Sequence, residues 1–253
     1  MDEKKFPSYN FACAIDDMLN DISFVIRKKE HLVNTPLQIY IRDLLGYKKD
    51  IIYAHIPNIK SSKQNPLSIK HLLNEGYLPL AIINYLLLVG YKTDKDFFSL
   101  KDAILWYDIS KISKSSLSFD IKKLKELNKR HIQNSDSLKL SSFLGFKSKQ
   151  IGDLAKLYAQ ELSSINEIKE KIDKIFSQKN CEDKECEKLK EEILKAPFFE
   201  DFDNFANYLI NKTSLEERVF FKYLRYLLTG VKKGPKLSDI YPHIKNYIKE
   251  ITR

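Results

Sequence analysis

The chain has 253 residues, of which 43% are hydrophobic and 30% are charged, as is typical of a soluble globular protein with one large or two medium domains. No run of about 18 apolar residues occurs, and the first residues lack the apolar core of a signal peptide. The sequence therefore excludes a membrane span and predicts a cytoplasmic location. The formal net charge of +9 suits a polyanionic partner, and only 7 Gly and 8 Pro favour helix over turn-rich folds.

Residues 1–59 read as a small α/β unit. The apolar runs Phe11–Ile15, Ile22–Ile26 and Ile51–Ile56 predict three strands. A helix is expected from Asn34 or Thr35, with a proline in its first turn and a glycine at its end. So short a unit leaves an open sheet edge, which proteins normally pair or cover.

The segment from Lys60 to Gly90 is a polar loop followed by two short helices. Ser68 is expected to cap the first helix and Gly76 to end it, while Pro79 suits the first turn of the second. From the pattern alone, this is a basic loop before a buried helical hairpin.

Lysines dominate residues 109–132, which follow a helix with a predicted capping box of Ser99 and Asp102. Apolar residues at 121, 124 and 127 form a stripe, so the lysines face outward. The residues leave two interpretations open, a solvated helix face and a face that contacts phosphates.

Residues 135–253 read as helices at 151–163, 165–177, 183–195, 200–211, 214–229 and 238–251. Cys181 and Cys186 have no neighbouring His or third Cys to complete a zinc set, so reduced thiols and no structural metal are predicted.

Several strings in collinear order resemble bacterial glutamyl-tRNA synthetases. The clearest are Gly76-Tyr77-Leu78-Pro79, Asn84-Tyr85-Leu86 with Gly90, and Leu228-Thr229-Gly230 with Gly234-Pro235. Further matches are Tyr9-Asn10-Phe11-Ala12, Val25-Ile26-Arg27, Asn34-Thr35-Pro36, Ala54-His55-Ile56-Pro57, Ser113-Lys114-Ser115 and Leu127-Asn128.

The resemblance implies a fold, a set of domains and roles for particular residues. The fold would be an α/β fragment, the second half of a class I Rossmann domain, followed by a mainly helical region. Residues 1–59 would be a partial catalytic unit, 60–134 a KMSKS-like loop with a stem-contact region, and 135–253 a helical anticodon-binding domain.

Tyr9 and Arg27 would bind glutamate, and a guanidinium suits a carboxylate. Lys60, Ser62 and Lys63 would form the degenerate loop at the phosphates of ATP, with Mg if the chain is active. The resemblance implies tRNA, of a glutamate or glutamine isoacceptor, as partner, with contacts from Lys111, Lys114, Lys122, Lys123, Lys129 and Arg130.

Three departures from the family pattern shape the functional prediction. Lys28 and Lys29 stand where the family string carries Gly and Glu, and the loop has Gln64 at its final basic position. No HxGH string includes any of the five histidines. We therefore expect an N-terminally truncated synthetase, lacking the HIGH half and the acceptor-stem domain, which makes glutamyl-tRNA only with that half in trans. A non-catalytic paralogue that binds tRNA or regulates, and a helical interaction protein, are the alternatives.

Overall fold

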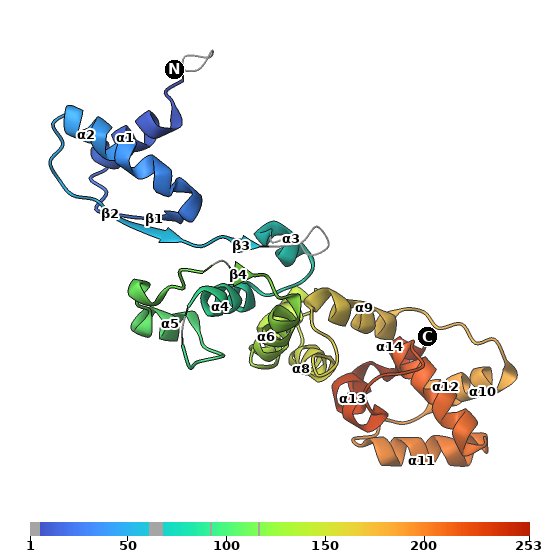
Figure 1. Cartoon of the computed structure of the whole chain (residues 1–253). Coiled ribbons are helices and arrows are strands. Elements are labelled where there is room, and N and C mark those ends of the chain that lie inside the picture. The colour runs from blue at the N-terminus through green and yellow to red at the C-terminus, as the bar shows by residue number, and fades with distance from the viewer. Residues whose placement is uncertain (1–5, 61–67, 92, 116) are drawn as a thin grey trace. The chain divides into compact units, whose positions relative to one another are not determined.

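The computed structural model describes residues 6–60, 68–91, 93–115 and 117–253, and the chain divides into two compact units (Figure 1). Unit 1 comprises residues 1–67 and 83–120, and unit 2 comprises residues 68–82 and 121–253. The division crosses helix α4 (Pro79–Gly90), whose first turn belongs to unit 2 and whose remainder belongs to unit 1.

Unit 1 begins with a small α/β segment. Its elements are α1 (Tyr9–Leu19), β1 (Phe24–Lys28), the 3-10 helix η1 (Lys29–Asn34), α2 (Thr35–Leu44) and β2 (Ile52–Ile56). β1 and β2 pair in parallel with Arg27 opposite His55, and α1 packs against α2. The helix predicted after Asn34 is confirmed, and it ends before Gly46, which has a φ of +77°. The strands expected at 22–26 and 51–56 correspond to β1 and β2.

The strand predicted at Phe11–Ile15 is wrong, because these residues lie inside α1. A short apolar run does not by itself distinguish a strand from a buried helical turn. The run contains two alanines, which are strong helix formers. Ala14 is fully buried, whereas Phe11 at the other end of the run is exposed.

The remainder of unit 1 is built around α4. It contains β3 (Ile59–Lys60), α5 (Leu100–Trp106), the 3-10 helix η2 (Ile109–Lys111) and β4 (Leu117–Ser118). β3 and β4 pair in parallel. The predicted capping box is confirmed, since Ser99 and Asp102 each accept a hydrogen bond from the other's backbone N–H.

Unit 2 is helical throughout the part that the structure describes. Its helices are α3 (Ile69–Asn74), α6 (Ile121–Gln133), α7 (Ser137–Phe143), α8 (Lys149–Tyr158), α9 (Ile165–Phe176), α10 (Lys184–Lys195), α11 (Phe202–Thr213), α12 (Glu217–Thr229), α13 (Leu237–Ile244), η3 (Lys245–Tyr247) and α14 (Ile248–Thr252). Isoleucine and leucine side chains spaced by a helical turn fill its core, for example Ile168, Ile172 and Ile175 of α9.

The helix predictions for this unit hold with two differences. α7 was not predicted, and the helix expected at 238–251 is divided into α13, η3 and α14, with Pro242 inside α13. Proline lacks the N–H that would continue the helical hydrogen bonding, which favours a break in such a segment. The α/β beginning and the mainly helical remainder are thus confirmed in this coarse form.

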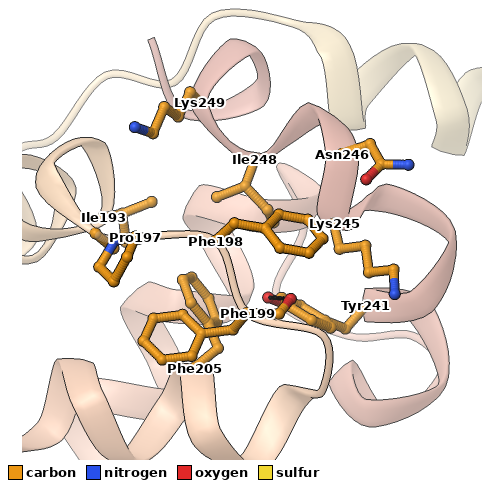
Figure 2. A pocket seen from close by; sticks show the side chains of 11 residues that line it. Ile193, Pro197, Phe198, Phe199, Phe205, Tyr241, Lys245, Asn246, Ile248 and Lys249 are labelled. Carbon is orange, nitrogen blue, oxygen red and sulfur yellow. Dashed lines mark hydrogen bonds between the residues drawn. The ribbon is translucent and has the colours of Figure 1, made fainter.

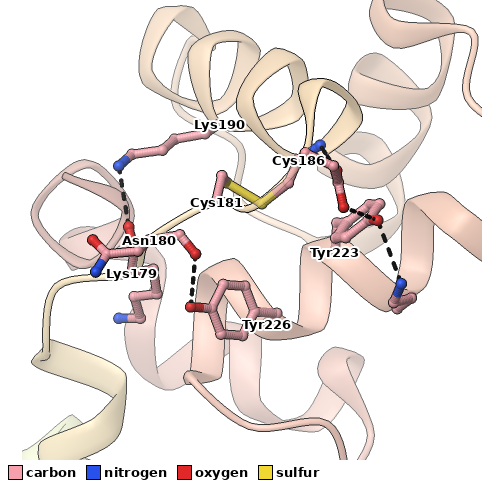
Figure 3. Close-up of a disulfide and its surroundings, with 9 residues drawn as sticks. Lys179, Asn180, Cys181, Cys186, Lys190, Tyr223 and Tyr226 are labelled. Carbon is pink, nitrogen blue, oxygen red and sulfur yellow. Dashed lines mark hydrogen bonds between the residues drawn. A yellow bond between two sulfur atoms is a disulfide. The ribbon is translucent and has the colours of Figure 1, made fainter.

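The prediction of reduced thiols at Cys181 and Cys186 is wrong in this structure, which joins them in a disulfide (Figure 3). Asp183 caps α10 and accepts a hydrogen bond from the N–H of Cys186, 2.9 Å away. This cap curls the loop back and places the two Cα atoms 5.5 Å apart, within the range that a disulfide needs. Cys13 is a free thiol.

Candidate functional site

Arg27 lies in β1 and its guanidinium is held by three neutral side chains. Nη1 donates to Gln38 Oε1 at 2.7 Å, Nη2 donates to Thr35 Oγ1 at 2.6 Å, and Nε donates to His55 Nε2 at 3.3 Å. The guanidinium carbon also lies 4.8 Å from the centre of the Tyr53 ring. Strand pairing explains the His55 contact, because Arg27 and His55 are partners in the β1–β2 register.

Gln38 connects Arg27 to the first helix. Its side chain is fully buried, and Nε2 donates to Asn10 Oδ1 at 3.0 Å. The chain continues from Asn10 to Asn34 at 3.4 Å and from Asn34 to His31 at 3.4 Å. A buried amide must satisfy both its donor and its acceptor, and Gln38 does so only when Arg27 and Asn10 occupy these positions.

Tyr9 lies at the far end of this polar chain. Its hydroxyl lies 3.3 Å from His31 Nδ1, and the two rings are 5.6 Å apart. Burial and the neighbouring Cys13 raise the pKa of Tyr9, while the charge of Arg27 acts in the opposite direction. The structure therefore links Tyr9 and Arg27, the two residues predicted to bind glutamate, through the network of Gln38, Asn10, Asn34 and His31.

The Arg27 guanidinium has no counter-ion among the described residues, since no carboxylate of theirs lies within 4.0 Å of it. Burial, followed by the charges of Arg27 and His31, lowers the pKa of His55, so His55 is neutral at pH 7. At Arg27 the site thus presents a fixed positive charge that is oriented by neutral partners. Such an arrangement suits the carboxylate of a small ligand.

Lys60 is the only residue of the predicted catalytic loop that the structure describes, because Ser62 and Lys63 lie outside the described residues. Lys60 is exposed in β3, and its carbonyl accepts a hydrogen bond from Phe119 N at 2.8 Å. The backbone is therefore anchored at the point where the loop begins. The exposed ammonium group is a chemically suitable partner for a phosphate.

The residues that match the family pattern most closely have structural roles. Asn84 accepts a hydrogen bond from Phe98 N at 3.3 Å, and the buried Tyr85 hydroxyl accepts one from Asp120 N at 2.6 Å. Both residues are more than nine-tenths buried. These side chains fix the connections around α4 within unit 1, so the string identifies a fold rather than a set of reacting groups.

Asn128 has the same kind of role in unit 2. Its Oδ1 accepts from Leu78 N at 2.8 Å, and its Nδ2 donates to Ser163 O at 2.7 Å. Gly76 adopts a φ of +84°, and its carbonyl accepts a hydrogen bond from Ile165 N at 3.0 Å. The prediction that Gly76 ends a helix is confirmed, and Ser68 caps that helix as expected by accepting from His71 N.

The six basic residues predicted to contact tRNA belong to two units. Lys111 and Lys114 are exposed in unit 1. The other four lie on α6 in unit 2, where Lys122 and Lys123 are exposed and Lys129 and Arg130 are half-buried. The Lys129 ammonium is 3.5 Å from the carbonyl of Gln160. The helix presents these cations opposite a buried stripe that includes Leu124 and Leu127.

Sequence reasoning missed the residues that hold Arg27. Thr35 and His55 lie in strings that matched the family but received no role, and Gln38 received none either. Their signal is weak because a contact between residues 11 or 28 positions apart leaves no local pattern. Within the described ranges, no cluster of three or more His, Cys, Asp or Glu is arranged to hold a metal, and no helix is long and apolar enough to cross a membrane.

Comparisons with known proteins show which proteins this chain is similar to. Residues 2–126 match the family model described as tRNA synthetases class I (E and Q), catalytic domain. The chain is 47% identical to glutamate–tRNA ligase 2 of Sulfurimonas denitrificans, over 100% of this chain and 61% of that protein. It is 46% identical to glutamate–tRNA ligase 2 of Campylobacter jejuni subsp. doylei, over 98% of this chain and 60% of that protein. The chain thus spans about 60% of the length of these curated relatives.

A solved structure has the same fold. The crystal structure of a glutamate tRNA ligase from Elizabethkingia meningosepticum in complex with its amino acid aligns with a TM-score of 0.68 at 20% identity, covering 97% of this chain and 59% of that one.

The prediction of a synthetase truncated at its N-terminus is contradicted by these matches. The catalytic-domain model matches from residue 2 onward, so the beginning of this chain corresponds to catalytic domain. The prediction rested on a missing signature string, and the absence of one string is weaker evidence than a match along 125 residues, from 2 to 126.

Proposed function

Because this chain is 47% identical to a glutamate–tRNA ligase and its residues 2–126 match the class I (E and Q) catalytic domain, we propose that it is a glutamate–tRNA ligase family member that binds L-glutamate at Arg27 and Tyr9 and binds a tRNA through its basic residues. The reaction of such a protein would be the ATP-dependent attachment of glutamate to tRNA, in the cytoplasm. The tRNA would be a glutamate or glutamine isoacceptor.

The observation that carries the proposal is the environment of Arg27. Three neutral side chains orient the guanidinium, and no carboxylate of the described chain lies within 4.0 Å of it. A half-buried cation without a counter-ion is costly unless a ligand supplies one. The side-chain carboxylate of glutamate would supply that charge, and the hydroxyl of Tyr9 offers a further polar contact. Glutamine, which has no side-chain charge, would bind less tightly.

The tRNA would be bound by cations of both units. Lys111 and Lys114 would contact phosphates from unit 1, and Lys122, Lys123, Lys129 and Arg130 from α6. Residues 60–134 would then contribute stem contacts, and residues 135–253 would contact the anticodon arm. The net charge of +9 supports a polyanionic partner of this kind.

A class I synthetase catalytic domain implies the use of ATP. Lys60 would face its phosphates, and Mg would accompany the nucleotide. Lys60 suits this role because its ammonium group is exposed while its backbone is fixed by β4. Ser62 and Lys63, the remaining predicted loop residues, would act beside it. The chain's contribution would be charge neutralisation and positioning, which supply most of the catalysis in reactions of phosphate groups.

Isothermal titration with L-glutamate tests the glutamate site. The wild-type chain should bind L-glutamate, and Arg27→Gln should lose binding by at least tenfold, because a charge-assisted pair is worth about 1.5–3 kcal/mol. Arg218→Gln, which removes an exposed arginine of unit 2, is the matched control and should bind as the wild type does. Equal binding by Arg27→Gln, or equal affinity for glutamine, would contradict the assignment.

A second candidate is a paralogue that binds tRNA without forming an aminoacyl adenylate. Lys28 and Lys29 favour it, since they place two cations where the family string has Gly and Glu. Lys28 lies 3.8 Å from Glu30, which offsets part of this added charge. Glutamate-dependent exchange of pyrophosphate into ATP distinguishes the two. Exchange above background supports the ligase, and tRNA binding with no exchange supports the paralogue.

A further inference from the structure

The disulfide between Cys181 and Cys186 has no part in the function proposed so far. Cys181 lies in the loop before α10, and Cys186 lies in the first turn of that helix (Figure 3). The two residues differ in exposure, because Cys181 is half-buried whereas Cys186 is only 1% exposed. A molecule that arrives from solvent therefore reaches the bond at the sulfur of Cys181.

The cavities next to the two cysteines show the same asymmetry. An open cleft of about 430 Å³ is lined by Cys181 and by residues of α10. The cavity that Cys186 lines, together with Tyr223 and Tyr226, has a volume of about 180 Å³. Pockets that take small organic ligands usually measure about 300–1,000 Å³, so of the two the cleft at Cys181 suits a small molecule.

Carboxylates outnumber ammonium groups in this cleft. Its exposed charged side chains are Glu182, Asp183, Lys184, Glu187, Lys188 and Glu191. The Lys188 ammonium donates to the carbonyl of Thr213 at 2.6 Å. Glu191 pairs with Lys195 at 3.3 Å, so one charge of each sign is already engaged. Because a cleft lined mainly by one sign of charge attracts ions of the opposite sign, this cleft favours a cationic reactant over an anionic one.

The loop that the disulfide closes is attached to the helices around it. The carbonyl of Asn180 accepts a hydrogen bond from the Tyr226 hydroxyl at 3.0 Å (Figure 3). The carbonyl of Lys179 accepts one from the Lys190 ammonium at 3.3 Å. These hydrogen bonds hold the loop beside Cys186 when the two sulfurs are separated, so the disulfide closes again without refolding of the unit.

A cavity at the other end of α10 offers a comparison. It has a volume of about 200 Å³ and is lined by aromatic rings, among them Phe198, Phe199 and Tyr241 (Figure 2). None of the described residues that line it carries a sulfur atom or a carboxylate. A change at Phe198 therefore serves as a control for the chemistry at the disulfide.

We propose that Cys181 and Cys186 form a redox-active pair that exchanges with small thiols, with cationic thiols faster than with anionic ones. Cys181 is the sulfur that the incoming thiolate attacks, and Cys186 is the resolving cysteine. Redox-sensing cysteines commonly combine an accessible sulfur with such a neighbour. The tests use neither glutamate nor tRNA, so their outcome is independent of the function proposed above.

The exchange consists of two displacements. A thiolate attacks Sγ of Cys181, so that a new S–S bond forms there while the bond to Cys186 breaks and its electron pair stays on Cys186 as a thiolate. A second thiolate then attacks the mixed disulfide, which leaves both cysteines reduced and the two small thiols oxidised to their disulfide. When Cys186 attacks instead, the small thiol is released and the original bond returns.

Single-cysteine variants test which sulfur reacts. In a Cys13→Ser background, Cys186→Ser leaves only the thiol of Cys181, and Cys181→Ser leaves only that of Cys186. Incubation with excess cystamine, followed by mass spectrometry of the intact chain, gives the rate of adduct formation. Cys186→Ser should react at least about tenfold faster, because its remaining thiol is accessible. Equal rates, or a faster reaction at Cys186, would overturn the assignment.

The wild-type chain gives a second measurement that does not depend on the folding of a variant. Brief reaction with cysteamine in the presence of N-ethylmaleimide traps the mixed disulfide, because the released thiolate is alkylated before it can close the bond. Peptide mass spectrometry should place the cysteamine on Cys181 and the maleimide on Cys186. The reverse placement would contradict the roles assigned to the two cysteines.

The rates of reduction by cysteamine and by 2-mercaptoethanesulfonate test the acidic cleft. Each rate is divided by that of the same thiol with hydroxyethyl disulfide, a neutral reference, so that intrinsic differences between the thiols cancel. The normalised rate should be at least about threefold higher for cysteamine at about 100 mM salt and nearly equal at about 1 M. The double variant Glu182→Gln, Glu187→Gln should lose this preference, whereas Phe198→Ala should keep it. Equal normalised rates at the lower salt would overturn the preference for cationic thiols.

Discussion

Gln38 Oε1 accepts a 2.7 Å hydrogen bond from Arg27 Nη1, although the Gln38 side chain has no solvent exposure. A neutral amide thus holds a cation where a carboxylate would form a stronger pair. The difference matters for function, because a carboxylate at position 38 would neutralise Arg27 permanently. A neutral partner orients the guanidinium and leaves its charge for a ligand.

Gln38→Glu tests this relationship. The added carboxylate should pair with Arg27 and compete with the carboxylate of L-glutamate, raising the Kd at least tenfold, while the new ion pair preserves the fold. Titration calorimetry gives the Kd and thermal unfolding gives the Tm. Gln150→Glu, at an exposed position, should change neither. Unchanged glutamate affinity in Gln38→Glu would show that Arg27 does not bind the ligand.

Gly76→Ala should lower the free energy of unfolding by about 2–4 kcal/mol, because strain at positive φ adds to a steric clash. A Cβ there would lie 2.7 Å from the backbone nitrogen of Asn166. Gly46→Ala is the matched control, since Gly46 has a φ of +77° but nothing within 4 Å of the added atom. It should cost only about 1 kcal/mol. Urea unfolding curves measure both, and equal losses would argue against the close approach at Gly76.

Reduction of the Cys181–Cys186 disulfide should lower the stability of unit 2 by about 2 kcal/mol, the chain-entropy contribution expected for so short a loop. Urea unfolding with and without dithiothreitol measures this loss. The Cys181→Ser variant should be insensitive to the reductant, and Cys13→Ser should respond as the wild type does. A wild-type chain that is equally stable in both conditions would show that the thiols are not joined in solution.

Lys179 makes stability depend on pH. Its side chain is 1% exposed, and its ammonium group donates to the carbonyls of Ile175 and, at 3.0 Å, of Ile251. Burial, and to a lesser degree the charge of Lys190, lowers the pKa of Lys179 to about 8. The folded state therefore binds this proton less tightly than the unfolded state, whose lysine has its ordinary pKa of 10.5.

The sign of the effect follows from proton linkage. Between pH 8 and 10.5 the unfolded chain holds more protons at Lys179, so this residue's contribution to stability rises with pH. The stability of the wild type relative to Lys179→Met should increase by roughly 1–3 kcal/mol from pH 7 to pH 10. Urea unfolding of both chains at each pH gives the difference, in which the titration of other groups cancels. A difference that is constant with pH would contradict the lowered pKa.

Local sequence signals predicted the helix ends correctly, because a cap depends only on the residues next to it. Ser68, Ser99 and Gly76 act on their own helix ends, and each prediction is confirmed. The apolar run Phe11–Ile15 is predicted as a strand because five consecutive apolar residues show no helical spacing of hydrophobic positions. The disulfide escaped prediction because it depends on how the Asp183 cap curls the loop, which two cysteines in a charged string do not reveal.

The site was predictable only in part. The resemblance named Tyr9 and Arg27, and the structure connects them through side chains that are distant in sequence. Gln38 and His55 are positioned by the packing of α2 and by the β1–β2 register, so no short motif contains them. The tRNA-contacting lysines stay a prediction, because a charged helix face has the same pattern whether it meets phosphates or solvent.

The most direct test of the account is the binding of the purified chain to total tRNA at 50 and 200 mM salt. We predict tight binding at 50 mM that falls by 10³ or more at 200 mM, as about six phosphate contacts would require. The double variant Lys122→Gln, Lys123→Gln should bind more weakly with a shallower salt dependence, whereas Lys212→Gln, Arg218→Gln should behave as the wild type. No binding at 50 mM, or binding indifferent to salt, would contradict the proposal that this chain binds tRNA.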